Sequence, residues 1–176
     1  MTTNEKQIID LQDNLELLRK LYGWTAEQLG DRLGISKQSV LNLEKGPENG
    51  GVKMTMIQYI AIRAVFEAEL ENRKDEEKKN LQTILGLILN DDSKVDPEDK
   101  ERILDSAKVV SNSMMTGDKS AAVKTMSVLL ASVASAAIVT PVVGGAVAAV
   151  GTLAAWTSSM LKNKKKKEIE KKENKK

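Results

Sequence analysis

The sequence predicts an all-α protein, and three observations lead to this prediction. Ala, Leu, Lys and Glu are abundant among the 176 residues, whereas aromatic residues make up 3% of the chain and proline occurs three times. Such a composition favours helices. Apolar residues recur at spacings of three and four, as they do along one face of a helix. The segments that carry these patterns are separated by glycines and by residues that cap helices, which marks where each helix begins and ends.

The first helix is predicted over residues 4–21. Its apolar residues would form one buried stripe, and they are Ile8, Leu11, Leu15, Leu18 and Leu21. Gly23 follows and should end the helix. Thr25, with Gln28 three residues later, has the capping-box pattern that begins a second short helix. We expect this second helix to end at Gly34, since glycine readily adopts the left-handed conformation found at helix ends.

A third helix is predicted to begin after Ser36, because serine is favoured at the N-cap position. Val40 and Leu43 should face inward, and the pair Gly46-Pro47 should stop the helix. The residues expected to face outward are Lys37, Gln38, Ser39, Leu41 and Asn42.

Further helices are predicted up to residue 118. The first begins at Thr55, and its buried face is expected to consist of Ile57, Ile60, Ala61, Ala64, Val65 and Ala68. The apolar run at 81–89 either continues that helix or starts another. A later helix should begin at Pro97 and end near Gly117, since proline and acidic residues favour a first turn. Together these patterns predict a charged helical connector over residues 69–118.

The C-terminal part begins with an unusually apolar segment. Residues 125–161 are 37 consecutive positions without a charge, and Pro141 divides them. A membrane-spanning helix needs about 20 apolar residues, so residues 119–161 are predicted to form a hydrophobic helical hairpin that crosses a membrane. The alternative is the buried core of a soluble oligomer. Residues 162–176, with nine Lys and three Glu, are expected to be a solvated tail, or else to bind anionic lipid or DNA.

The segment GWTAEQLGDRLGISKQSVLNLEKG at residues 23–46 resembles the helix-turn-helix motif of the Cro/repressor-type (XRE) family. The resemblance spans about residues 1–68 and implies a lambda-repressor-like DNA-binding domain. Gly30 stands where the family usually has alanine, which indicates that the two motif helices cross closely. Gly34 stands where the chain turns in the left-handed region. The acidic and basic residues of the first 54 positions nearly balance, so the same fold could instead serve protein contacts.

The resemblance implies which residues bind DNA. In this family the second motif helix lies in the major groove, and its N-terminal residues touch base edges. Lys37 is then expected to donate to guanine N7 and O6, Gln38 to pair with adenine N6 and N7, and Leu41 to contact a thymine methyl group. Lys45 and Lys53 are expected to bind phosphates. The full set of candidate DNA-binding residues is Thr25, Lys37, Gln38, Ser39, Leu41, Asn42, Lys45 and Lys53.

The amino-acid composition excludes several kinds of catalytic and metal-binding site. Cysteine and histidine are both absent, which removes disulfides, thiol nucleophiles, imidazole bases and the usual zinc ligands. No glycine-rich phosphate loop is present, so we expect neither an enzyme nor a bound cofactor. Acidic residues interrupt the N-terminus, which does not resemble a signal peptide. The net charge of +2 hides a tail of +6 and a preceding chain of −4, so overall charge gives no argument for DNA binding.

The sequence therefore predicts a sequence-specific, DNA-binding transcriptional regulator with a cytoplasmic DNA-binding domain. Its expected partners are double-stranded DNA, a second copy of the chain or a higher oligomer, and membrane lipids through residues 120–161. Two alternatives remain open. One is a membrane-active effector, holin-like or toxin-like, with an N-terminal docking domain, and the other is a soluble oligomeric regulator with the hydrophobic segment as its core.

Overall fold

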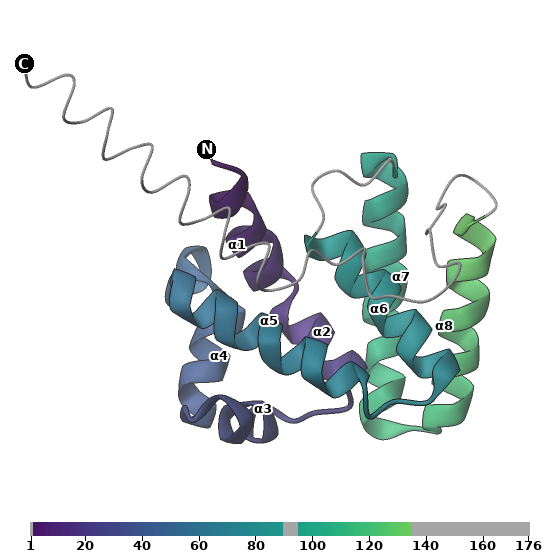
Figure 1. Ribbon diagram of the computed structural model, residues 1–176, viewed down its shortest axis with the longest axis horizontal. Helices are drawn as coiled ribbons and strands as arrows, with labels where there is room; N and C mark the ends of the chain where they lie inside the picture. The colour runs from purple at the N-terminus through teal and green to yellow at the C-terminus, as the bar shows by residue number, and fades with distance from the viewer. Residues whose placement is uncertain (1, 90–94, 135–176) are drawn as a thin grey trace, which may run out of the picture. The chain divides into compact units, whose positions relative to one another are not determined.

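The computed structural model describes residues 2–89 and 95–134, which belong to one compact unit (Figure 1). All the regular structure in these two ranges is helical, which confirms the predicted fold class for this part of the chain. The helices are α1 (Thr3–Asp13), α2 (Leu15–Leu21), α3 (Ala26–Leu33), α4 (Lys37–Lys45), the short 3-10 helix η1 (Pro47–Asn49), α5 (Met56–Leu70), α6 (Asp75–Leu89), α7 (Pro97–Thr116) and α8 (Lys119–Ala134).

The predicted first helix is interrupted at Asn14, so that two helices replace the single one expected over residues 4–21. Asn14 has φ −109° and ψ 11°, and its side-chain amide donates to the backbone oxygen of Asp10 at 2.8 Å. Asparagine side chains compete in this way with helical backbone bonds. The apolar stripe is nevertheless buried as predicted, since all five of its residues lie in the core.

The caps predicted for the motif helices are confirmed. The Thr25 hydroxyl accepts a hydrogen bond from Gln28 N at 3.1 Å, and the Gln28 side chain accepts one from Thr25 N at 2.8 Å. Gly34 ends α3 in the left-handed conformation with φ 68°. The Ser36 hydroxyl then accepts from Ser39 N at 3.1 Å and starts α4. Local sequence thus determines the limits of both motif helices.

Helix α5 begins after Thr55 as predicted, but it buries the opposite face. The core takes Tyr59, Ile62, Arg63, Phe66 and Leu70, whereas Ile57 is 79% exposed. The predicted face was wrong because the two aromatic side chains offer more area to bury than the aliphatic residues opposite them. The Arg63 guanidinium is accommodated by Glu67, at 2.7 Å between Nε and Oε1.

Three aromatic side chains join the α2–α3 turn to α5. The Tyr22 ring centroid lies 5.0 Å from that of Trp24 and 4.7 Å from that of Phe66, and Trp24 stacks on Phe66. The Tyr22 hydroxyl donates to the Phe66 carbonyl at 3.0 Å, and burial raises the pKa of Tyr22 so that this donor keeps its proton. The cluster fixes the position from which α3 begins.

Helices α6 and α7 pack directly on the N-terminal helices. α6 contacts α1, and α7 contacts α2. The buried face of α6 is apolar and includes Leu81, Ile84, Leu85 and Ile88. α7 starts with Asp96 as its N-cap and ends before Gly117, as predicted. The division of the chain at residue 68 into a domain and a connector stays a prediction.

Helix α8 packs on α6 and α7 and buries Ala122, Met126 and Leu130. Within residues 2–89 and 95–134, no helix has both the length and the apolar character to span a membrane. The rest of the predicted hairpin, residues 135–161, and the Lys-rich tail lie outside the described residues, so both remain predictions.

Candidate nucleic-acid interface

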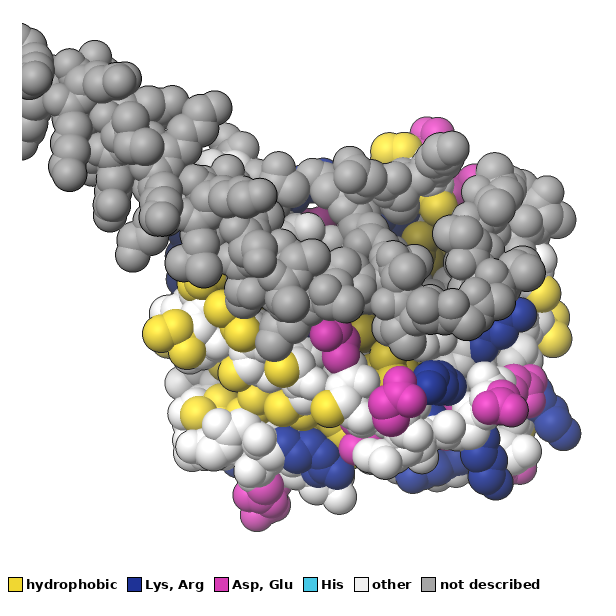
Figure 2. All heavy atoms as spheres, viewed as in Figure 1, with side chains coloured by type: hydrophobic (Ala, Val, Ile, Leu, Met, Phe, Trp, Pro, Cys, Tyr) yellow, Lys and Arg dark blue, Asp and Glu magenta, His cyan; other side chains and the backbone are white. Residues whose placement is uncertain are grey.

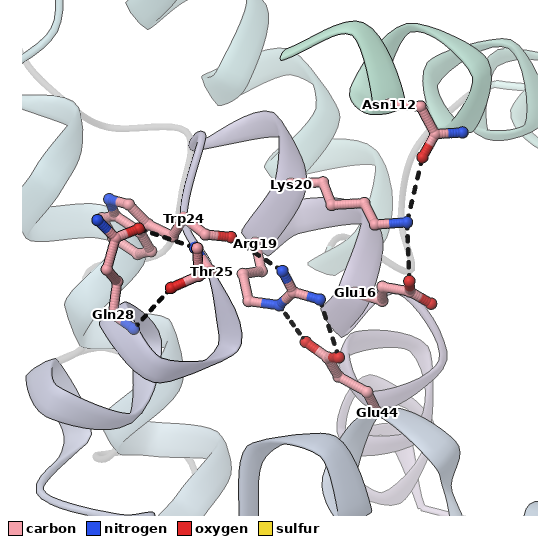
Figure 3. A network of polar contacts seen from close by, with 8 residues as sticks. All are labelled: Glu16, Arg19, Lys20, Trp24, Thr25, Gln28, Glu44 and Asn112. Atoms are coloured by element: carbon pink, nitrogen blue, oxygen red, sulfur yellow. Dashed lines mark hydrogen bonds and ion pairs between the residues drawn. The ribbon is translucent and has the colours of Figure 1, made fainter. Parts of the chain in front are cut away.

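A buried ion pair holds α4 to α2. The Arg19 guanidinium binds the Glu44 carboxylate through two nitrogens, one of them at 3.0 Å, and donates to the Trp24 carbonyl at 2.9 Å (Figure 3). The two side chains are only 8% and 6% exposed. Bidentate pairs of this kind restrict the relative geometry of the two side chains and are also stronger than single hydrogen bonds. The last turn of α4 is therefore anchored to α2, while Lys37 and Gln38 in its first turn are exposed.

The turn between α3 and α4 is tight at Gly30. A Cβ atom placed on Gly30 would lie 2.6 Å from the carbonyl oxygen of Ile35. Ile35 N also donates to the Gly30 carbonyl at 3.0 Å. No other residue type fits this approach without a shift of the backbone, so the close crossing predicted from the sequence is present.

The loop after α4 is anchored by Gln12 of α1, a residue that sequence reasoning did not single out. Its side-chain nitrogen donates to the carbonyls of Leu43 and Val52 at 2.8 and 2.7 Å, and its oxygen accepts from Met54 N at 2.8 Å. Gln12 is 4% exposed. One buried amide thus satisfies three backbone groups and fixes the loop that carries Lys53.

The outward face of α4 contains the candidates for base contacts. Lys37 and Gln38 are exposed in the first turn, while Leu41 and Asn42 are half-buried. The Gln38 amide donates to the Asn42 side chain at 2.9 Å, so these two amides form one polar surface. Ser39 is turned back toward Ser36, with 2.9 Å between the two hydroxyl oxygens. Val40 and Leu43 face inward, as predicted.

The candidate phosphate contacts lie at the edges of this face. Lys45 and Lys53 are exposed, and Thr25 is exposed at the N-cap of α3. Among the described residues, Lys37, Lys45 and Lys53 form no ion pair, whereas Lys78 binds Glu71 and Lys108 binds Asp105. A lysine without a carboxylate partner can bind a phosphate without first breaking an ion pair, and such contacts release counterions from DNA.

Carboxylates lie near the same loop. The pKa of Asp13 is raised by partial burial and by the negative charges of Asp10 and Glu48. Asp10 lies on α1 with Asp13, and Glu48 lies on η1.

Comparison with known proteins identifies the motif. Residues 15–50 match the family model described as helix-turn-helix. The curated proteins and the solved structures gave no match to the chain. The matched range runs from α2 to the residue after η1 and has α3 and α4 at its centre. The match shows a helix-turn-helix segment at residues 15–50 and supports the resemblance of residues 23–46 to the Cro/repressor-type (XRE) family.

Proposed function

We propose that the chain is a sequence-specific transcriptional regulator in which α4 lies in the major groove of DNA. The observation that carries the proposal is the way α4 is held: the buried Arg19–Glu44 pair fixes its last turn, and its first turn presents Lys37 and Gln38 to solvent. Lysine recognises guanine and glutamine recognises adenine through their major-groove edges. Asn42, bonded to Gln38, would orient that amide toward a base.

The phosphate contacts in this proposal are Lys45, Lys53 and Thr25. Lys45 is the last residue of α4, Lys53 lies on the loop after it, and Thr25 is the N-cap of α3. Phosphate contacts set the position of a protein on the duplex, whereas base contacts select the sequence. Leu41 is proposed to contact a thymine methyl group, and Ser39 contributes through its bond to the α4 N-cap. No catalytic step belongs to this function.

We further propose that the DNA-binding form is a homodimer. One helix-turn-helix module covers only a few base pairs, and paired modules read half-sites about 34 Å apart. Helix α5 offers a surface for a second copy, since Ile57, Ala61 and Ala68 are exposed on one apolar face. Figure 2 shows hydrophobic side chains gathered along α5. Small residues allow two such helices to approach closely.

The C-terminal part of the proposal rests on the sequence. Residues 135–161 are uncharged and are followed by the Lys-rich tail, and they are long enough for one membrane-embedded segment of about 20 residues. We propose that this segment holds the DNA-binding domain at the cytoplasmic face of a membrane. Full-length protein that pellets with membranes, resists alkaline carbonate and dissolves in detergent would support this. A defined oligomer in the soluble fraction, without detergent, would support the oligomer-core alternative.

The DNA-reading function is tested by selecting duplexes from a random pool with the full-length chain. Lys37→Ala and Gln38→Ala should relax or abolish the sequence preference, because these side chains face the bases. Lys45→Ala should weaken binding to every duplex alike. It should also lower the slope of log affinity against log salt concentration by about one unit. The proposed function is wrong if the selection yields no preferred sequence. It is also wrong if a variant that combines Lys37→Ala, Gln38→Ala and Lys45→Ala binds as the wild type does.

A further inference from the structure

The junction between α7 and α8 lies against the turn that leads into the helix-turn-helix motif. α7 packs along α2, and the Lys20 ammonium donates to the Asn112 side chain at 3.1 Å (Figure 3). A Cβ atom placed on Gly23 would lie 3.4 Å from Nζ of Lys119 and 3.8 Å from its Cε. The first residue of α8 therefore brings its ammonium group to the α2–α3 turn, although it lies far beyond the matched segment.

The charge of Lys119 is available at this place. Lys20 is already bound to Glu16, at 2.8 Å, and to Asn112. Lys119 is exposed and forms no ion pair with any residue in the described ranges. The neighbouring Asp118 carboxylate accepts from Ser120 N at 2.8 Å and is committed to capping α8. Lys119 is thus the unpaired cation beside the turn.

The α2–α3 turn lies close in sequence to Thr25, one of the proposed phosphate contacts. Gly23 lies two residues before Thr25, the N-cap of α3 and a proposed phosphate contact, and two residues span at most about 7 Å. Successive phosphates of one DNA strand are about 3.4 Å apart along the helix axis. The separation between Thr25 and this turn is therefore comparable to the spacing of neighbouring phosphates on one strand.

We propose that Lys119 is an additional phosphate contact, by which the helices after the motif enlarge the DNA interface. The proposal rests on the DNA-binding function proposed above. The ammonium of Lys119 would bind a phosphate oxygen next to the one held at Thr25. Because such a contact carries no base information, it strengthens binding to all duplexes and leaves the sequence preference unchanged.

The test measures the affinity of the full-length chain, in mild detergent, for a duplex of about 30 base pairs, about three helical turns. Lys119→Gln should lower the slope of log affinity against log salt by about 0.9. Between about 50 and about 200 mM salt, the wild type should then lose about 3.5-fold more affinity than the variant. Lys124→Gln is the matched control, since Lys124 is also exposed on α8 and forms no ion pair within the described part of the chain.

Lys45→Gln separates this inference from the function on which it rests. A lower slope for Lys45→Gln and for Lys119→Gln, with a wild-type slope for Lys124→Gln, supports the contact. An unchanged slope for Lys119→Gln alone overturns the inference and leaves the proposed function standing. Equal reductions for Lys119→Gln and Lys124→Gln indicate a general charge effect and also overturn it. If no variant changes the slope, the proposed function fails together with the inference.

Discussion

At the scale of single residues, two buried polar side chains hold α4 and the loop that follows it in place. Glu44 joins the end of α4 to Arg19 of α2, and Gln12 joins the loop after α4 to α1. Both side chains are hidden from solvent, where an unpaired polar group is costly. The outward residues of α4 owe their positions to these contacts, which touch no DNA themselves.

Glu44→Ala should therefore destabilise the fold strongly. The substitution leaves the Arg19 guanidinium buried without its carboxylate, which typically costs about 3–5 kcal/mol. Urea unfolding followed by circular dichroism measures the change in the free energy of unfolding. Glu16→Ala is the control, because it removes the exposed partner of Lys20 and should cost less than about 1 kcal/mol. Equal costs for the two variants would contradict the role given to the buried pair.

Neither buried contact could be predicted from the sequence. Glu44 was placed within the motif and Gln12 within the first helix, but pairing with Arg19 or with the carbonyl of Val52 depends on how the helices pack. The side chain of Lys119 was missed for the same reason, since only the packing of α7 on α2 brings it to Gly23. Patterns among adjacent residues do not show which residues far apart in the sequence become neighbours in the fold.

At the scale of helices, capping residues predicted the boundaries well and apolar patterns predicted the buried faces less well. Thr25, Ser36 and Gly34 form the predicted caps and turn, because these depend only on adjacent residues. The face of α5 was assigned by counting aliphatic residues, yet Phe66 and its aromatic contacts decide which side is buried. Two faces of similar apolar character can be told apart only by what packs on them.

The α3–α4 turn gives a prediction at this scale. Gly30→Ala would push a methyl group against the Ile35 carbonyl and should cost about 1–3 kcal/mol, as overpacking does. The helix crossing should also shift, which lowers affinity for the selected duplex. Unfolding in urea gives the stability, and amide chemical shifts show whether residues of α4 move.

Gly34→Ala is the contrasting variant in the same turn. A Cβ atom at Gly34 meets nothing within 4 Å, but the residue has φ 68°. We expect a cost of about 1–2 kcal/mol from the left-handed backbone, with the chemical shifts of α4 nearly unchanged. If Gly30→Ala also leaves α4 unmoved and the protein fully stable, close packing does not set the crossing.

At the scale of the whole molecule, the proposed dimer depends on the α5 face opposite the core. Ile57→Asp places a charge at the N-terminal end of the proposed interface, on its largest exposed apolar side chain, and should yield a monomer in sedimentation experiments. The free energy of unfolding of the monomer should barely change, because Ile57 is 79% exposed. Val109→Asp, on the exposed side of α7, is the control and should leave the dimer intact. A wild type that sediments as a monomer on its DNA site would disprove the dimer.

The last prediction concerns where the DNA-binding unit ends. Helix α8 covers α6 and α7 with Met126 and Leu130, and the buried Asn80 donates to the Val123 carbonyl at 3.1 Å and to the Ser127 hydroxyl at 2.8 Å. A fragment of residues 1–134 keeps these contacts. It should unfold at the same temperature as the described helices of the full chain and should still bind DNA.

A fragment of residues 1–118 should behave differently, because it removes α8 and leaves apolar side chains of α6 and α7 uncovered. Loss of two large buried side chains alone is expected to cost several kcal/mol, about 1.5–3 kcal/mol for each, and Asn80 loses both partners. Thermal unfolding of the two fragments measures this difference. Fractionation of cells then separates the two roles of the C-terminal part, since residues 1–134 should leave the membrane pellet in which we expect the full chain. Equal unfolding temperatures would show that α8 does not stabilise the domain, and a full chain that is soluble without detergent would exclude the membrane anchor.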